Sequence, residues 1–178
     1  MIFKELEIKG AFLIHAEPFE DERGVFRRNF CKKEFAEYGI STNVAQANIS
    51  ENTHKHTIRG FHYQIHPFGE SKTMTIIKGR IHDIILDLRK DSSTYLEWVS
   101  LELSPGQRTS FHVPAGCANA FLTMEDNTLV HYYSSFPFTA NAEKGIRYND
   151  PFFKFDWSIK EPKHISVKDD SWPDFTTE

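Results

Sequence analysis

Short apolar alternations separated by turn residues run through most of the chain. In "TMTIIKGRIHDIILDLR", β-branched and aliphatic residues extend from Thr73 to Ile77, residues 78–80 form a turn, and a second alternation runs from Ile81 to Leu88. This pattern predicts a β-hairpin. Further strands are predicted by "EWVSLEL", "RTSFHVP", "NAFLTM" and "TLVHYYS", with turn residues between them. Short strands at such regular spacing are typical of a β-sandwich or barrel.

Two segments depart from the strand pattern. "CKKEFAEYG" (31–39) predicts one short helix, because Phe35 lies at helical spacing from Cys31 and Tyr38, and Gly39 can end the helix. The final third is rich in proline, aromatic residues and aspartate, so we expect irregular chain that wraps back over the sandwich. A chain of 178 residues with 39% hydrophobic content suits one globular core, and we expect a single domain over residues 1–178.

Charge and hydropathy exclude two classes of partner. The net charge is -4, and the 21 Lys and Arg residues are spread through the chain rather than gathered in a basic patch, which argues against nucleic acid. No apolar run approaches the roughly 20 residues that a membrane span needs, and the N-terminal residues do not resemble a signal peptide. We therefore expect a cytoplasmic protein with no membrane partner.

Histidines in the middle of the chain raise the question of a metal site. His62, His66 and Glu70 are spaced four residues apart, and a Pro-x-Gly turn follows downstream, as in metal-binding β-helix proteins. The next ligand is missing, because Asn119 stands where a further histidine is needed and a neutral amide oxygen is a poor ligand for transition metals. Pro67 also interrupts any regular element before Glu70. We expect no metal and no cofactor.

His62 remains a candidate for proton chemistry. It lies between Phe61 and Tyr63 and shortly after Arg59, so its ring is expected in a partly dry pocket with a cation nearby. Imidazole titrates near neutral pH and serves as a general base. From the residues alone, a hydrogen-bonded core histidine and a catalytic histidine both remain open.

Seven segments together carry a resemblance to a known family. They are "DERGVF" (21–26), "QAN" (46–48), "IRGFHYQ" (58–64), "ESK" (70–72), "VPAGCANAF" (113–121), "GIRYNDP" (145–151) and "ISVKD" (165–169). In this order and spacing they resemble the dTDP-4-dehydrorhamnose 3,5-epimerase family of sugar-nucleotide isomerases. The resemblance implies an all-β, cupin-type jelly roll (a double-stranded β-helix) with one or two short helices.

The resemblance also implies an activity and its catalytic residues. The activity is metal-independent epimerisation of a nucleotide-linked 4-keto-6-deoxy sugar at carbon 3, carbon 5 or both, in rhamnose-like deoxysugar biosynthesis. By position, His62 would remove a proton beside the ketone, Asp169 would orient the histidine, and Tyr132 would protonate the opposite face. Lys72 and Arg59 are the cations available to stabilise the enolate.

The same resemblance implies how the nucleotide sugar is held. It places Gln46, Asn48 and Arg59 around the sugar and phosphates and Phe138 against the nucleobase. Arg23 and Phe26 would reach the site from the neighbouring subunit of a homodimer.

Three positions depart from the usual pattern of the family. Arg28 stands where a glutamate faces thymine, which puts thymidine specificity in doubt because a donor replaces an acceptor. Asn119 replaces a histidine near the sugar and bears on which ketosugar fits. Phe138 replaces a commoner tyrosine, and stacking survives that change.

Two other functions remain compatible with the sequence. A sugar-nucleotide 3,4-ketoisomerase would use similar proton transfers on the same fold, and a non-catalytic module would bind the sugar nucleotide without turnover. The presence of both Tyr132 and Asp169 favours epimerisation.

Overall fold

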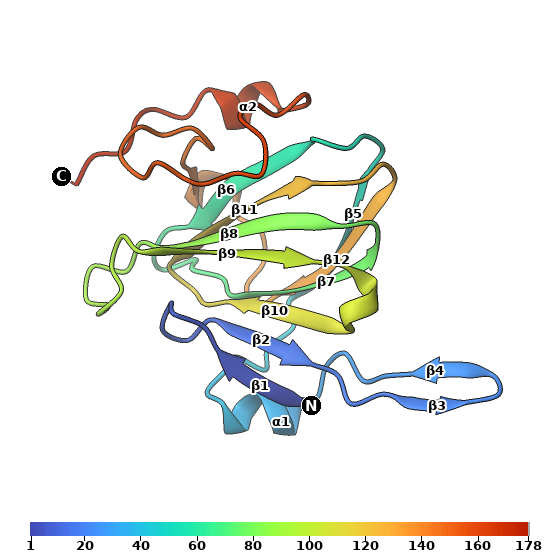
Figure 1. The fold of residues 1–178 in the computed structure, drawn as a ribbon. Helices are drawn as coiled ribbons and strands as arrows, with labels where there is room; N and C mark the ends of the chain where they lie inside the picture. Colours follow the sequence, from blue (N-terminus) through green and yellow to red (C-terminus); the bar gives the residue numbers. More distant parts are fainter. Residues whose placement is uncertain (178) are drawn as a thin grey trace.

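The computed structural model describes residues 1–177 and shows two β-sheets packed face to face (Figure 1). The elements are β1 (Ile2–Glu5), β2 (Phe12–His15), β3 (Phe19–Asp21), β4 (Gly24–Phe26), α1 (Lys32–Glu37), β5 (Gln46–Asn52), β6 (Ile58–Gln64), β7 (Lys72–Lys78), β8 (Ile81–Asp87), β9 (Trp98–Leu103), η1 (Pro105–Gln107), β10 (Thr109–Val113), β11 (Cys117–Thr123), β12 (Thr128–Ser134), η2 (Ala140–Ala142), β13 (Glu143–Gly145) and α2 (Val167–Asp170). One sheet has the order β1-β2-β10-β7-β12-β5 and the other β13-β6-β11-β8-β9. All their strand pairs are antiparallel. This sandwich confirms the expected all-β jelly roll.

The four strands predicted from residue 97 to residue 134 are present as β9, β10, β11 and β12. Their inward side chains build the main core between the sheets, together with residues of β7 and β8. Phe111 of β10 and Val130 of β12 come from one sheet, and Ile85 of β8 and Phe121 of β11 come from the other. Burial of apolar area at about 25 cal/mol per Å² makes this layer the main source of stability.

The strands on either side of Gly79 do not pair with each other, so the hairpin predicted between Thr73 and Leu88 is wrong. β7 lies between β10 and β12, whereas β8 lies between β11 and β9 in the other sheet. Gly79, with a φ of 81°, lies where the chain crosses from one sheet to the other. Met74 and Ile81 accordingly contribute to the core from opposite sheets. The alternation alone does not distinguish strands that pair from strands that face each other across a core.

The predicted helix and the irregular final third are both confirmed. α1 buries Phe35 completely, and Gly39 follows the helix with a φ of 69°. Beyond β13 the chain is mostly irregular and crosses the outer face of the β6–β11 side (Figure 1). Phe153 and Phe155 of this segment pack with Phe61 of β6. Near its end the segment forms α2, which lies against β6.

The β3–β4 hairpin projects from the body of the protein (Figure 1). It exposes the large apolar side chains of Phe19, Val25 and Phe26, and the last of these is 74% exposed. None of the helices in residues 1–177 has the length and hydropathy needed to cross a membrane.

Candidate active site

A β-bulge in β6 turns Arg59 and His62 toward the same cavity. Residues three positions apart on a regular strand face opposite sides. Here His62 is opposite Asn119 and Arg59 is opposite Phe121, so three steps on β6 match two steps on β11. Gly60 permits the bulge, because its φ is 109° and a side-chain carbon would lie 2.5 Å from the carbonyl oxygen of Asn119. Arg59 and His62 consequently line one cavity.

Asp169 of α2 holds the imidazole of His62. Its Oδ1 lies 2.7 Å from Nε2 of His62, and its Oδ2 accepts a hydrogen bond from the backbone N–H of Gly60. Ser166 caps α2 by accepting from the backbone N–H of Asp169. Burial raises the pKa of Asp169, but its hydrogen bonds with His62 and Gly60 outweigh burial and hold the pKa below its ordinary value. The ionised carboxylate therefore accepts from Nε2–H, which leaves Nδ1 of His62 with its lone pair.

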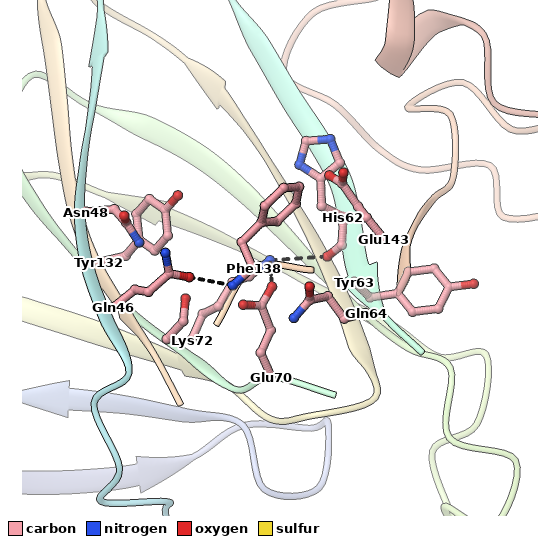
Figure 2. A pocket seen from close by; sticks show the side chains of 11 residues that line it. Gln46, Asn48, His62, Tyr63, Gln64, Glu70, Lys72, Tyr132, Phe138 and Glu143 are labelled. Atoms are coloured by element: carbon pink, nitrogen blue, oxygen red, sulfur yellow. Dashed lines mark hydrogen bonds and ion pairs between the residues drawn. The ribbon is translucent and has the colours of Figure 1, made fainter. Parts of the chain in front are cut away.

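Tyr132 faces this cavity from the opposite sheet. It lies on β12 and lines the same cavity as His62. Burial raises the pKa of the phenol, the charge of Glu70 raises it further, and Arg59 opposes both. The phenol is thus protonated at neutral pH and has a proton to give. Figure 2 shows Tyr132 and His62 on opposite sides of the cavity.

Lys72 provides a buried cation beside His62. Its Nζ lies 3.1 Å from Oε1 of Glu70 and 3.5 Å from the carbonyl oxygen of His62. Only 14% of the Lys72 side chain and 8% of the Glu70 side chain are exposed. A carboxylate at this distance limits the movement of the ammonium group. Sequence reasoning considered Glu70 only as a metal ligand and missed this pairing, which depends on the loop that returns the chain from β6 to β7.

The spacing of His62, His66 and Glu70 does not create a metal site. His66 is exposed on the loop after β6, while His62 contacts Asp169 and Glu70 contacts Lys72. Within residues 1–177, no group of three or more His, Cys, Asp or Glu side chains is arranged to hold a metal ion.

The mouth of the cavity is built from β5 and the loop after β12. Gln46 and Asn48 line the cavity, and Oε1 of Gln46 accepts from the backbone N–H of Phe138 at 2.5 Å. Gln64 fixes the same loop by accepting from the backbone N–H of Thr139. Phe138 is 56% exposed, so its ring is available to a flat ligand group at the entrance (Figure 2). This outer part of the cavity has a volume of about 350 Å³, and the adjoining part lined by Arg59 and Asn119 has a volume of about 190 Å³.

Three expected binding residues lie outside this cavity. Arg23 and Phe26 belong to the projecting hairpin, and Arg23 pairs with Asp21. Arg28 follows the hairpin and donates to Glu34 at 2.8 Å. The described part of the chain brings together the nine other predicted site residues, namely His62, Tyr132, Asp169, Gln46, Asn48, Arg59, Lys72, Asn119 and Phe138, in or directly beside the space between the sheets.

Asp83 is a buried acid that sequence reasoning did not identify. It lies on β8 with no exposed surface, and its Oδ2 accepts from Nδ2 of Asn119 at 2.9 Å. Its Oδ1 has no hydrogen-bond partner among the described residues. Burial raises the pKa of Asp83 to about 8, against the opposing effects of Asn119 and the charge of Lys72. The sequence "HDIILD" indicates a buried strand but not which acid is left with a single partner.

Asp83→Asn is expected to remove part of the pH dependence of stability. The native state keeps a proton that the unfolded state loses between pH 3.8 and about pH 8. The free energy of unfolding therefore falls by about 1.4 kcal/mol per pH unit as pH rises through this window. An amide does not titrate, and the slope halves as pH reaches the native pKa, so from pH 6 to pH 8 the variant should lose about 2 kcal/mol less than the wild type. Urea denaturation at both pH values measures this, with exposed Asp91→Asn as the control. Parallel behaviour of wild type and Asp83→Asn would contradict the prediction.

The geometry agrees with comparisons to known proteins. The sequence model of the dTDP-4-dehydrorhamnose 3,5-epimerase family matches residues 5–177. The family's protein from Sinorhizobium fredii is 34% identical over 173 residues, which cover 97% of this chain and 89% of the relative. The crystal structure of the enzyme from Elizabethkingia anophelis superimposes with a TM-score of 0.92 at 30% identity, covering 98% of this chain and 96% of that one.

A third comparison includes a bound sugar nucleotide. The epimerase of Legionella pneumophila in complex with dTDP-4-keto-L-rhamnose superimposes with a TM-score of 0.88 at 29% identity, and the match covers 94% of this chain and 89% of that one. These relatives are epimerases, which supports the epimerase interpretation over the ketoisomerase and the non-catalytic module. The comparisons confirm the resemblance and the isomerase class inferred from it, and the chain belongs to the dTDP-4-dehydrorhamnose 3,5-epimerase family.

Proposed function

We propose that the protein inverts carbon 3, carbon 5 or both of a nucleotide-linked 4-keto-6-deoxy sugar by proton removal and return, with no metal or redox cofactor. The observation that carries the proposal is the contact of His62 with Asp169 at a cavity whose opposite wall holds Tyr132. The relative with dTDP-4-keto-L-rhamnose bound supports the substrate class. Deoxysugar biosynthesis in the cytoplasm is the setting that we propose for this reaction.

His62 removes the proton through Nδ1 in this mechanism. A proton beside a ketone is far less acidic than imidazolium, and a gap of roughly ten pK units makes direct transfer unfavourable by about 14 kcal/mol. Lys72 and Arg59 line the cavity with His62 and place positive charge where the enolate oxygen forms. Fixed charges in a site with little water stabilise such an oxyanion by several kcal/mol.

Exchange with solvent deuterium tests the reaction. The protein is incubated in deuterated water with 4-keto-6-deoxy sugars linked to different nucleotides, and deuterium at carbons 3 and 5 is followed by proton NMR. We expect incorporation at carbon 3, carbon 5 or both for at least one sugar, with the ketone retained at carbon 4. Movement of the carbonyl would indicate ketoisomerisation instead, and absence of incorporation for every candidate would overturn the proposed function.

Asp169→Asn is expected to slow exchange by about 100-fold. An asparagine amide can donate to Nε2 of His62, which favours the tautomer with its proton on Nδ1 and blocks the basic nitrogen. The pH dependence of exchange should change as well, because the imidazolium loses its carboxylate partner. Asp170→Asn is the matched control, since Asp170 is the exposed next residue of α2, and it should exchange within about twofold of the wild type. Similar rates in the two variants would contradict the positioning role of Asp169.

A homodimer is the second part of the proposal. The exposed apolar hairpin and the absence of Arg23 from the cavity of its own chain support a hairpin that completes the partner's site. Mixing inactive Arg23→Ala and His62→Ala subunits tests this arrangement. In a mixed dimer one site has both residues intact, so random exchange should restore about a quarter of wild-type activity. Recovery of no activity from dimers shown to be mixed would contradict the exchange of hairpins.

The nucleobase is the third part of the proposal. We propose a base other than thymine, because Arg28, which would reach the partner's site together with the hairpin, offers donors where the family usually offers an acceptor carboxylate. Thermal shifts with dTDP, UDP, CDP and GDP compare the bases, since a ligand at 100 times its dissociation constant stabilises by about 2.7 kcal/mol. We expect dTDP to raise the melting temperature less than one of the others does, and Arg28→Glu to restore its advantage. A largest shift for dTDP with the wild type would overturn this part.

A further inference from the structure

The side-chain amide of Asn119 has both of its hydrogens directed into the protein. Nδ2 donates to Oδ2 of Asp83 at 2.9 Å and to the sulfur of Met74 at 3.3 Å. The carbonyl oxygen accepts no hydrogen bond from any residue in 1–177 and is not among the fully buried polar atoms that lack a partner. Asn119 lines the cavity with His62 and Tyr132. Its carbonyl oxygen is therefore the polar atom that this side chain offers to a ligand.

Asp83 and Met74 together fix this orientation. Asp83 is fully buried on β8 and Met74 is 3% exposed on β7, so neither group can turn away into solvent. A flipped amide would bring its carbonyl oxygen against the carboxyl group and the thioether and leave both amide hydrogens without these acceptors. Buried donors and acceptors that lose their partners make the flipped orientation unfavourable. A neutral Asp83 that carries its proton on Oδ1 still accepts through Oδ2, and the sulfur accepts in either protonation state, so the observed direction of the amide suits both.

The oxygen is also close to the reacting part of the site. Asn119 is directly opposite His62 in the register of β11 with β6. A 4-keto-6-deoxy hexose linked through carbon 1 carries free hydroxyl groups only at carbons 2 and 3, next to or at the carbon that loses its proton. An acceptor beside the catalytic histidine is thus placed to bind one of these two hydroxyl groups.

We propose that Asn119 is a specificity residue that accepts a hydrogen bond from the hydroxyl group at carbon 2 or carbon 3 of the sugar, and that Asp83 is the positioning residue that holds its amide in this direction. The inference rests on the proposed function and adds that the sugar subsite at Asn119 offers a hydrogen-bond acceptor rather than a donor. A histidine at this position can present an N–H donor, whereas the oriented amide presents only an acceptor. The site accordingly selects ketosugars with a free hydroxyl group and rejects those in which it is absent or methylated.

The test is a thermodynamic cycle in which the Asn119 side chain is truncated in the protein and one hydroxyl group is removed from the substrate, separately and together. Deuterium exchange at the carbon that the wild type exchanges, carbon 3 or carbon 5, is measured for the ketosugar and for its 2-deoxy and 3-deoxy analogues. With the full sugar, Asn119→Ala should lower kcat/KM about tenfold, mainly by raising KM. The same substitution should have no effect on the analogue that lacks the bound hydroxyl group. If this is the 2-deoxy analogue, Asn119 binds the hydroxyl group at carbon 2, and if it is the 3-deoxy analogue, Asn119 binds the one at carbon 3.

Asp83→Asn tests the positioning role. It should raise KM for the full sugar by less than Asn119→Ala does, and the double variant should resemble Asn119→Ala alone, because Asp83 acts only through Asn119. Ser50→Ala is the control, since Ser50 lines the same cavity from β5 and should affect the full sugar and both analogues equally. Melting temperatures of all variants identify any that fail to fold.

Two outcomes separate the inference from the proposed function. If Asn119→Ala lowers kcat/KM equally for the full sugar and for both analogues, Asn119 only shapes the cavity and the inference is wrong. If the wild type exchanges no deuterium with any ketosugar, the proposed catalysis is wrong instead. The same cycle measured as Kd by calorimetry then tests the inference, and equal losses of affinity, or no binding of any of the three sugars, overturn it.

Discussion

His62→Ala is expected to slow solvent exchange into the ketosugar by about 10,000-fold, at the upper end of what a general base contributes. Among the described residues that line the pockets shared by His62 and Tyr132, no other side chain is an imidazole. Asp169 orients the imidazole of His62 through a hydrogen bond with Nε2. The variant therefore loses the whole oriented ring, including the basic Nδ1. Exchange at carbons 3 and 5, followed by NMR at constant pH, measures the loss.

Two further measurements make this prediction specific. His66→Ala removes an exposed histidine from the adjacent loop and should leave exchange within about twofold of the wild type. Added imidazole should restore part of the activity of His62→Ala, because the truncated side chain leaves room for a base in the cavity. A loss below tenfold in His62→Ala, with the protein folded, would mean that another group removes the proton.

Most of the strands and the helix of this protein follow from short-range sequence signals. Apolar alternation and turn residues predict β9 to β12, and the spacing of Phe35 predicts α1. The error at Gly79 has a clear cause, because tight turns within a sheet and tight crossings between sheets use the same residues. Only long-range pairing, which local pattern does not contain, places β7 and β8 in different layers.

The candidate site was predictable mainly through the resemblance. Alternation along β6 would place Arg59 and His62 on opposite faces, and a bulge that depends on Gly60 corrects this. Asp169 is 107 positions from His62 along the chain, and by its composition alone the surrounding segment suggests a solvated turn. The structure instead buries Asp169 at 4% exposure. Asp83 has no signal beyond its strand, since the burial that makes it unusual arises from packing across the two sheets.

Tyr132→Phe is expected to separate proton exchange from inversion. Removal of the proton depends on His62, so exchange should stay within about tenfold of the wild type, whereas inversion should fall by about 1,000-fold because no acid remains on the opposite face. His62 alone can return deuterium only to the face from which it removed the proton. Product configuration is determined from ring proton coupling constants, and exchange is measured on the same samples.

Tyr133→Phe is the matched control for this separation. Tyr133 is the next residue of β12 but points into the cluster around Phe35, where its hydroxyl group donates to the backbone oxygen of Asn29 at 3.1 Å. Its loss should cost about 1 kcal/mol of stability and leave exchange and inversion unchanged. If Tyr132→Phe reduced exchange and inversion by the same factor, Tyr132 would act before or during proton removal. The acid on the opposite face would then have to be another group that lines the cavity.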